Sequence, residues 1–135
     1  MSAARKPKPE APDSPPPRIL VVEDDILVRT VVAAYLRECG YEAAEAGSAD
    51  EAIRILQSSM RIDIVFCGVA EPGSMVGFGL AQWVRRRWPD IKVILTSGAQ
   101  RTAKAAGELC EAGPMLAKPY DHADLARRIR SLLAR

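Results

Sequence analysis

The sequence has little of what marks a membrane, metal-binding or secreted protein. It contains one histidine and three cysteines, Cys39, Cys67 and Cys110, which form no CxxC pair. Clustered Cys/His metal ligation is therefore not expected. No apolar run approaches the ~20 residues that a membrane-spanning helix needs, and the polar beginning does not resemble a signal peptide. We expect a cytoplasmic protein with reduced thiols.

The charge balance is small and the chain is short. A net charge of +2 over 135 residues does not by itself favour direct binding of nucleic acid or of an anionic membrane. Six of the ten prolines lie in residues 1–17, where apolar residues are too sparse to form a core. We predict a disordered Pro-rich tail over 1–17 and one globular domain over 18–135.

Short apolar runs alternate with amphipathic stretches from residue 18 onward. The runs lack polar interruptions, which is typical of strands covered on both faces. Ser48 begins a capping box with Glu51, Asp121 can cap the last helix, and Gly40 suits the end of the first. We predict strands at 19–22, 41–46, 62–67, 91–96 and 115–117, and helices at about 28–36, 49–56, 80–88, 101–111 and 122–133.

This alternation predicts the α/β class with a doubly wound, five-stranded parallel sheet. Ligands of such sheets bind beyond the carboxyl ends of the strands. Glu23 and Asp24 follow the first expected strand. Thr96 ends the fourth, and Lys118 follows the fifth. An acidic pair suits Mg²⁺, and a hydroxyl with an ammonium suits a phosphoryl group. A solvated polar rim is the plainer alternative.

These residues carry a resemblance to a known family. Four stretches occur in the order and spacing of the receiver domains of two-component response regulators: Ile-Leu-Val-Val-Glu-Asp-Asp at 19–25, Pro-Gly at 72–73, Thr-Ser-Gly at 96–98 and Lys-Pro-Tyr at 118–120. The resemblance implies a flavodoxin-like fold with strand order 2-1-3-4-5. It also implies that Glu23 and Asp24 are the metal-binding pair, and that Thr96 and Lys118 contact the phosphoryl group.

Two positions depart from the family pattern. Gly68 stands where the resemblance places the phospho-accepting aspartate, and it supplies neither a nucleophile nor a third Mg²⁺ ligand. Met115 stands where the family often has an aromatic switch residue. We therefore expect no catalytic residue, remnants of a phosphoryl site at Thr96 and Lys118, and weak Mg²⁺ binding at most.

The main hypothesis is a non-enzymatic, stand-alone, degenerate receiver (a pseudo-receiver) of phosphorelay signal transduction. It would bind a protein partner, namely a histidine kinase, a phosphotransfer protein or an effector, without phosphorylation at Gly68. By the resemblance, the partner surface comprises the helix in 101–111, the strand 115–117 and the last helix, with Arg127, Arg128 and Arg130 on its rim. We expect no contact with nucleic acid or membrane.

Two alternatives remain open. One is a competent receiver that is phosphorylated on another carboxylate by a histidine kinase or a small phosphodonor. The other is a small nucleotide-binding flavodoxin-like protein, although no phosphate loop follows the first expected strand.

Overall fold

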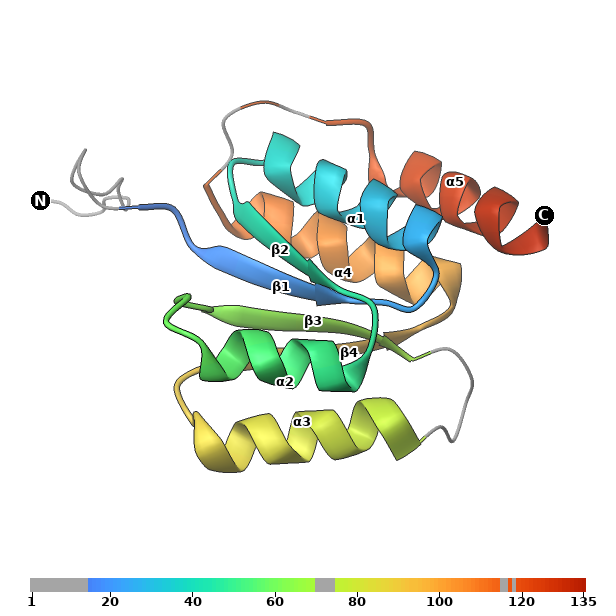
Figure 1. The fold of residues 1–135 in the computed structure, drawn as a ribbon. Coiled ribbons are helices and arrows are strands. Elements are labelled where there is room, and N and C mark those ends of the chain that lie inside the picture. The colour runs from blue at the N-terminus through green and yellow to red at the C-terminus, as the bar shows by residue number, and fades with distance from the viewer. Residues whose placement is uncertain (1–14, 70–74, 115–116, 118) are drawn as a thin grey trace, which may run out of the picture.

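The protein is a parallel β-sheet with helices on both faces (Figure 1). The computed structural model describes residues 15–69, 75–114, 117 and 119–135. The sheet of the described part has four strands, in the order β2-β1-β3-β4. These strands are β1 (Arg18–Val22), β2 (Glu42–Ala46), β3 (Ile64–Val69) and β4 (Lys92–Ser97). The helices are α1 (Ile26–Glu38), α2 (Ala49–Gln57), α3 (Met75–Arg87), α4 (Gly98–Ala112) and α5 (His122–Ala134).

The predicted α/β fold is confirmed, with the predicted order for the first four strands. The described sheet nevertheless has four strands where we expected five. The expected fifth strand falls on 115–117, and residues 115 and 116 lie outside the described part of the chain. The fifth strand therefore stays a prediction. So does the tail over 1–17, most of which also lies outside the described part.

The helix ends follow the local chemistry of the sequence. Ser48 Oγ accepts the backbone N–H of Glu51 at 3.1 Å, and Asp121 Oδ1 accepts that of Asp124 at 3.0 Å. Gly40, just beyond α1, has a φ of 103°, a left-handed conformation that favours glycine. The predicted caps of α2 and α5 and the predicted end of α1 are thus confirmed.

Two hydrophobic clusters lie on opposite faces of the sheet. On one face α1, α4 and α5 cover side chains of β1 and β3, including Ile19, Val21 and Phe66. On the other face α2 and α3 cover the alternate side chains of the same strands. Figure 1 shows α1 and α4 side by side above the sheet, with α5 next to them. The carboxyl ends of β1, β3 and β4 therefore open beside the first turns of α1 and α4.

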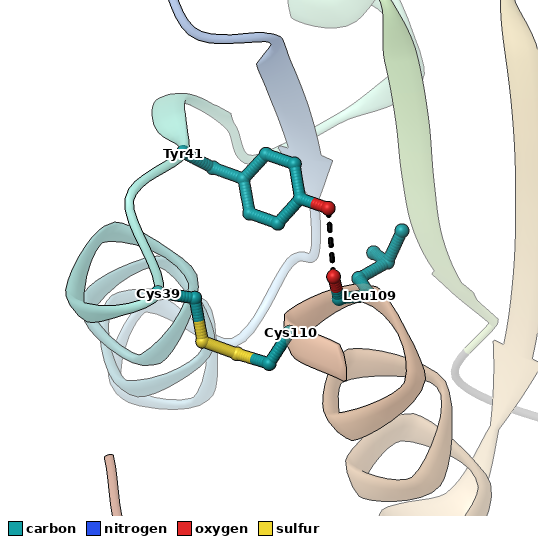
Figure 2. The surroundings of a disulfide bond; sticks show 4 residues. All are labelled: Cys39, Tyr41, Leu109 and Cys110. Carbon is teal, nitrogen blue, oxygen red and sulfur yellow. Dashed lines mark hydrogen bonds between the residues drawn. A yellow bond between two sulfur atoms is a disulfide. The ribbon is translucent and has the colours of Figure 1, made fainter. Parts of the chain in front are cut away.

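The cysteines correct one expectation. Cys39, at the end of α1, is disulfide-bonded to Cys110, in the last turn of α4 (Figure 2). Their Cα atoms lie 5.3 Å apart although 71 residues separate them. The expectation of three reduced thiols is wrong for this pair, because two helices that pack on the same face bring their last turns together. Cys67 is a free, buried thiol.

No helix in the described part of the chain combines the length and the apolar character needed to cross a membrane.

Candidate functional site

A cavity of about 170 Å³ lies at the carboxyl ends of β1, β3 and β4. Strand pairing creates it, because Val22 pairs with Cys67 and Gly68 pairs with Thr96. The residues directly after Val22 therefore face the end of β3. The walls comprise Glu23, Asp24, Asp25, Val28, Gly68, Thr96, Gly98, Thr102, Ile129 and Leu133.

Four of the five residues predicted from the sequence thus meet in one cavity: Glu23, Asp24, Gly68 and Thr96. The fifth, Lys118, lies outside the described residues, as does Met115. The sequence reasoning missed Thr102, Ile129 and Leu133. Ile129 and Leu133 belong to α5, and nothing in the sequence indicated that this helix borders the site.

Glu23 fills the space beside Gly68. A Cβ atom built on Gly68 would lie 2.5 Å from Glu23 Oε1 and 3.6 Å from Glu23 Cδ. Contacts under 3.0 Å are essentially never made by real Cβ atoms. The second carboxylate oxygen, Oε2, accepts the backbone N–H of Asp25 at 2.9 Å. In this arrangement the Glu23 carboxyl is compatible with glycine at position 68 and with no larger residue.

The Glu23 carboxyl has an unusual proton affinity. Burial raises its pKa from 4.5 to about 7. The N–H bond from Asp25 opposes this rise, whereas the side-chain bond and charge of Asp24 and the charge of Asp25 add to it. Near neutral pH the carboxyl is therefore divided between its protonated and ionised forms.

Asp25 has a structural task at the start of α1. Its Oδ1 accepts the backbone N–H groups of Leu27 at 3.0 Å and Val28 at 3.1 Å, which caps the helix. The same oxygen pairs with Arg135 Nη2 at 3.2 Å, so the end of α5 reaches the site. The bond from Val28, followed by that from Arg135, lowers the pKa of Asp25. The Asp25 carboxylate thus already binds groups of the protein and is a poor candidate for binding a ligand.

Thr96 is held by the helix that follows it. Its side chain is buried, and its Oγ1 lies 2.9 Å from Thr102 Oγ1. The contact ties the end of β4 to the first turns of α4. The hydroxyl therefore already has a partner inside the protein.

The described donors fit a divalent cation weakly. Among residues 15–69, 75–114, 117 and 119–135, no three His, Cys, Asp or Glu side chains form a group that could hold a metal ion. The Glu23 carboxyl lies against Gly68, and the Asp25 carboxylate accepts a backbone N–H group of α1. Mg²⁺ prefers octahedral oxygen coordination. The described part of this edge therefore offers at most two carboxylate ligands, namely Asp24 and a Glu23 side chain that has turned away from Gly68.

A second hollow lies away from the strand ends. It has a volume of about 520 Å³ and lies between α1 and α5, where Val31 and Leu132 provide apolar wall. Arg127 pairs with Asp124, and the Arg128 guanidinium lies 5.0 Å from the centre of the Tyr120 ring. Arg130 turns toward Gln100 on α4. The predicted basic rim is thus divided between two surfaces.

The sequence and the fold of this chain are both similar to those of known proteins. The family model described as "Response regulator receiver domain" matches residues 19–130. The "Transcriptional regulatory protein AruR" of Pseudomonas aeruginosa is 31% identical over 124 residues, covering 88% of this chain and 50% of that protein. The "Sensor kinase CckA" of Brucella abortus is 34% identical over 117 residues, covering 85% of this chain and 12% of that protein. The chain spans about half the length of the regulators it matches.

Solved structures share the fold. The response regulator protein TrrA of Thermotoga maritima, in complex with Mg²⁺-BeF, is 27% identical with a TM-score of 0.56, covering 86% of this chain and 98% of that one. A response regulator receiver protein from Pseudomonas putida is 24% identical with a TM-score of 0.57, covering 87% and 98%. The match over residues 19–130, together with the strand order, shows that this chain belongs to the response regulator receiver domain family.

Proposed function

We propose that this receiver domain acts as a pseudo-receiver, a signalling module that works through protein contact without phosphorylation at position 68. One observation carries the proposal. The space that an acceptor side chain would need beside Gly68 is filled by the Glu23 carboxyl, with Oε1 2.5 Å from the position of a Cβ. The Glu23 carboxyl thus occupies the space where an acceptor side chain would begin.

The neighbouring groups support the same conclusion. Thr96 Oγ1 is paired with Thr102 Oγ1, and Asp25 is occupied by α1 and Arg135. Transfer of a phosphoryl group needs a free carboxylate nucleophile with cations and donors aimed at the developing charge. The described edge has no free group at the position of the nucleophile. Lys118 keeps its role as a remnant of a phosphoryl site by matching position only.

The partner we propose is a protein: a histidine kinase, a phosphotransfer protein or an effector. The surface proposed for it comprises α4, residues 115–117 and α5. Arg127, Arg128 and Arg130 supply positive charge at its rim, and the adjacent 520 Å³ hollow offers apolar wall with the Tyr120 ring. A cytoplasmic location, the absence of enzymatic activity and the absence of nucleic-acid and membrane contacts belong to this proposal.

The test is direct phosphorylation chemistry. The chain is incubated with acetyl phosphate and Mg²⁺, and its intact mass is measured. Because Gly68 has no nucleophile and the Glu23 carboxyl is partly protonated near neutral pH, the mass is expected to stay unchanged. A stable gain of one phosphoryl group on any carboxylate would overturn the proposal.

A competent receiver that uses another carboxylate is the second candidate, and one observation favours it. Glu23 Oε1 stands beside the position of the expected acceptor, so it is the carboxylate nearest to the required place. If the mass rises, Glu23→Gln decides between carboxylates. Loss of the gain in that variant assigns the phosphoryl group to Glu23, and its persistence assigns it elsewhere.

A further inference from the structure

The Cys39–Cys110 disulfide joins the far ends of two helices that border the site. Cys39 caps the carboxyl end of α1, and Cys110 lies in the last turn of α4 (Figure 2). We propose that this pair is a thiol-oxidation site, a reversible crosslink by which a small disulfide oxidant fixes α4 against α1. The inference is independent of how, or whether, the site at Gly68 is phosphorylated.

The backbone places the two cysteines within bonding reach. The Cα–Cα distance of 5.3 Å falls in the range that disulfides span without backbone movement. Neither side chain is more than 3% exposed. A crosslink between these helices closes a long stretch of chain, which is the case in which a disulfide restricts the unfolded state most.

A hydrogen bond holds the same two segments together without the disulfide. Tyr41, two residues beyond Cys39, donates its hydroxyl to the Leu109 carbonyl at 2.7 Å (Figure 2). Leu109 precedes Cys110, and its carbonyl also accepts the N–H of Gly113 at 3.1 Å. The thiols therefore stay close together in the reduced protein, which makes the crosslink reversible within one fold.

An oxidant meets the two sulfurs unequally. A cavity of about 110 Å³ has Cys110 in its wall, together with Tyr35, Pro119 and His122. Cys39 does not belong to the described walls of that cavity. We assign the first attack to Cys110 and the resolving attack to Cys39.

The chemistry balances with an oxidant of the small-disulfide class, such as glutathione disulfide. The Cys110 thiolate attacks one sulfur of the oxidant, forms a mixed disulfide and releases one glutathione thiolate. The Cys39 thiolate then attacks the Cys110 sulfur and releases the second. Two protein thiols lose two protons and two electrons, and one glutathione disulfide becomes two glutathione thiols.

Cys67 provides an internal reference. It is buried at the end of β3, and burial, with the charge of Glu23 adding, raises the pKa of its thiol to about 11. A thiol with so little thiolate reacts slowly in exchange. Cys67 is therefore expected to stay a thiol under conditions that oxidise the pair.

The crosslink bears on the site through the helices themselves. Val28 in the first turn of α1 and Thr102 near the start of α4 both line the 170 Å³ cavity. Thr102 also holds Thr96. Fixing the last turn of α4 to α1 restricts any shift of α4 that would release the Thr96 hydroxyl.

The first experiment counts thiols in the whole chain. The native protein is equilibrated with excess glutathione disulfide or with excess reduced glutathione, then alkylated in denaturant and weighed. We expect one alkylated cysteine, Cys67, after oxidation and three after reduction. Three alkylated cysteines under both conditions, or a crosslink that contains Cys67, would overturn the proposal.

The second experiment measures thermal unfolding of the same samples. Oxidation is expected to raise the Tm of the parent by about 10 °C, from the loop-closure term and the size of the domain. The variant Cys39→Ala/Cys110→Ala is expected to show no difference, and Cys67→Ala is the matched control that keeps the parent's response. Equal Tm values for oxidised and reduced parent, or an undiminished response in the double variant, would contradict the crosslink.

Hydrogen exchange then locates the effect. Amides in the last turns of α1 and α4 are expected to exchange more slowly in the oxidised parent than in the reduced one. Those of α2, on the opposite face, are expected to be unchanged. Equal exchange in α4 under both conditions would show that the disulfide does not restrict this helix.

Discussion

At the scale of single residues, the glycine at position 68 determines where the neighbouring Glu23 side chain lies and how readily it ionises. Because Gly68 has no side chain, the carboxyl of Glu23 can lie over its Cα, where a Cβ would be 2.5 Å away. The move buries the carboxyl and raises its pKa to about 7. A residue that the resemblance implies as a metal ligand thus becomes the group that fills the site.

The first prediction concerns restoring the missing carboxylate. Gly68→Asp should raise Mg²⁺ affinity roughly tenfold, or about 1.4 kcal/mol, by adding an oxygen ligand to Glu23 and Asp24. The new Cβ must displace Glu23 Oε1, which is the end of a flexible side chain and can turn toward Asp24. Magnesium titration followed by acetyl phosphate and intact mass measures both effects, and we expect the variant to accept a phosphoryl group.

Gly68→Asn is the matched control for that experiment. It displaces Glu23 in the same way but brings no nucleophile, so its mass should stay unchanged. If Gly68→Asp binds Mg²⁺ no better than the parent and gains no mass, then Glu23 and Asp24 are only a polar rim and not the remnant of a metal site.

The second prediction follows from the raised pKa of Glu23. The folded protein holds this proton more tightly than the unfolded chain, whose carboxyl titrates near 4.5. The stabilisation is complete below pH 4.5 and is lost as the pH rises toward about 7, so the free energy of unfolding should fall over this window. Urea unfolding at a series of pH values measures it.

Glu23→Gln tests the assignment of that slope. The glutamine keeps an oxygen that can accept the Asp25 N–H but cannot ionise. The variant should therefore lose the decline between pH 4.5 and 7. The pKa of Asp25 is lowered from its ordinary value of 3.8, so the titration of Asp25 lies outside this pH window. An unchanged slope in Glu23→Gln would assign the titration to another group.

At the scale of elements, the capping residues in the sequence predicted where helices begin and end, but the sequence did not predict which helices pack together. The caps Ser48 and Asp121 could be read from side chains that compete for the first backbone N–H groups of a helix. The start of α4 could not. It was expected within 101–111 but begins at Gly98, directly after β4, because Gly98 turns the chain with a φ of 83°.

Which helices pack against each other depends on tertiary contacts that cannot be read from the sequence. The amphipathic stretches of the sequence predict that a helix has a buried face, but not which other helix that face meets. Gly107 shows the difference, since a Cβ there would lie 3.0 Å from the Cβ of His122. A residue without a side chain allows α4 and the start of α5 to approach closely. The packing of α1 against α4 likewise brings Cys39 to Cys110, which their spacing in the sequence did not indicate.

At the scale of the whole molecule, two hydrophobic clusters on either side of the sheet leave the basic side chains of α5 at the surface. Arg127 and Arg128 border the 520 Å³ hollow, whereas Arg130 reaches α4. Charges at the rim of an interface mainly accelerate association and make it sensitive to salt.

The third prediction concerns reversing the positive charge of α5. Arg127→Glu/Arg128→Glu/Arg130→Glu should slow association with a protein partner several-fold at low ionic strength, with a smaller effect on dissociation. Binding kinetics at low and high salt, with a partner recovered by pull-down on the parent, measure the change. The matched control is Arg54→Glu/Arg85→Glu/Arg86→Glu on α2 and α3, where the side chains are also exposed. Equal association rates for the two triple variants would place the partner on another surface.

The sequence by itself determined the fold class, the order of the first four strands, the caps of α2 and α5, and the meeting of Glu23, Asp24, Gly68 and Thr96 at one edge. The strand order and the role of position 68 were implied by the resemblance to receiver domains. The rest follows from local patterns and from the rule that the carboxyl ends of parallel strands lie at one edge of the sheet. Only the tertiary structure decided that Glu23 lies over Gly68, that Thr102 holds Thr96 and that Cys39 bonds to Cys110. The physical reason is that each is a short-range contact, set within a few ångströms by how whole helices pack on the sheet, and the spacing of residues along a chain carries no such distance.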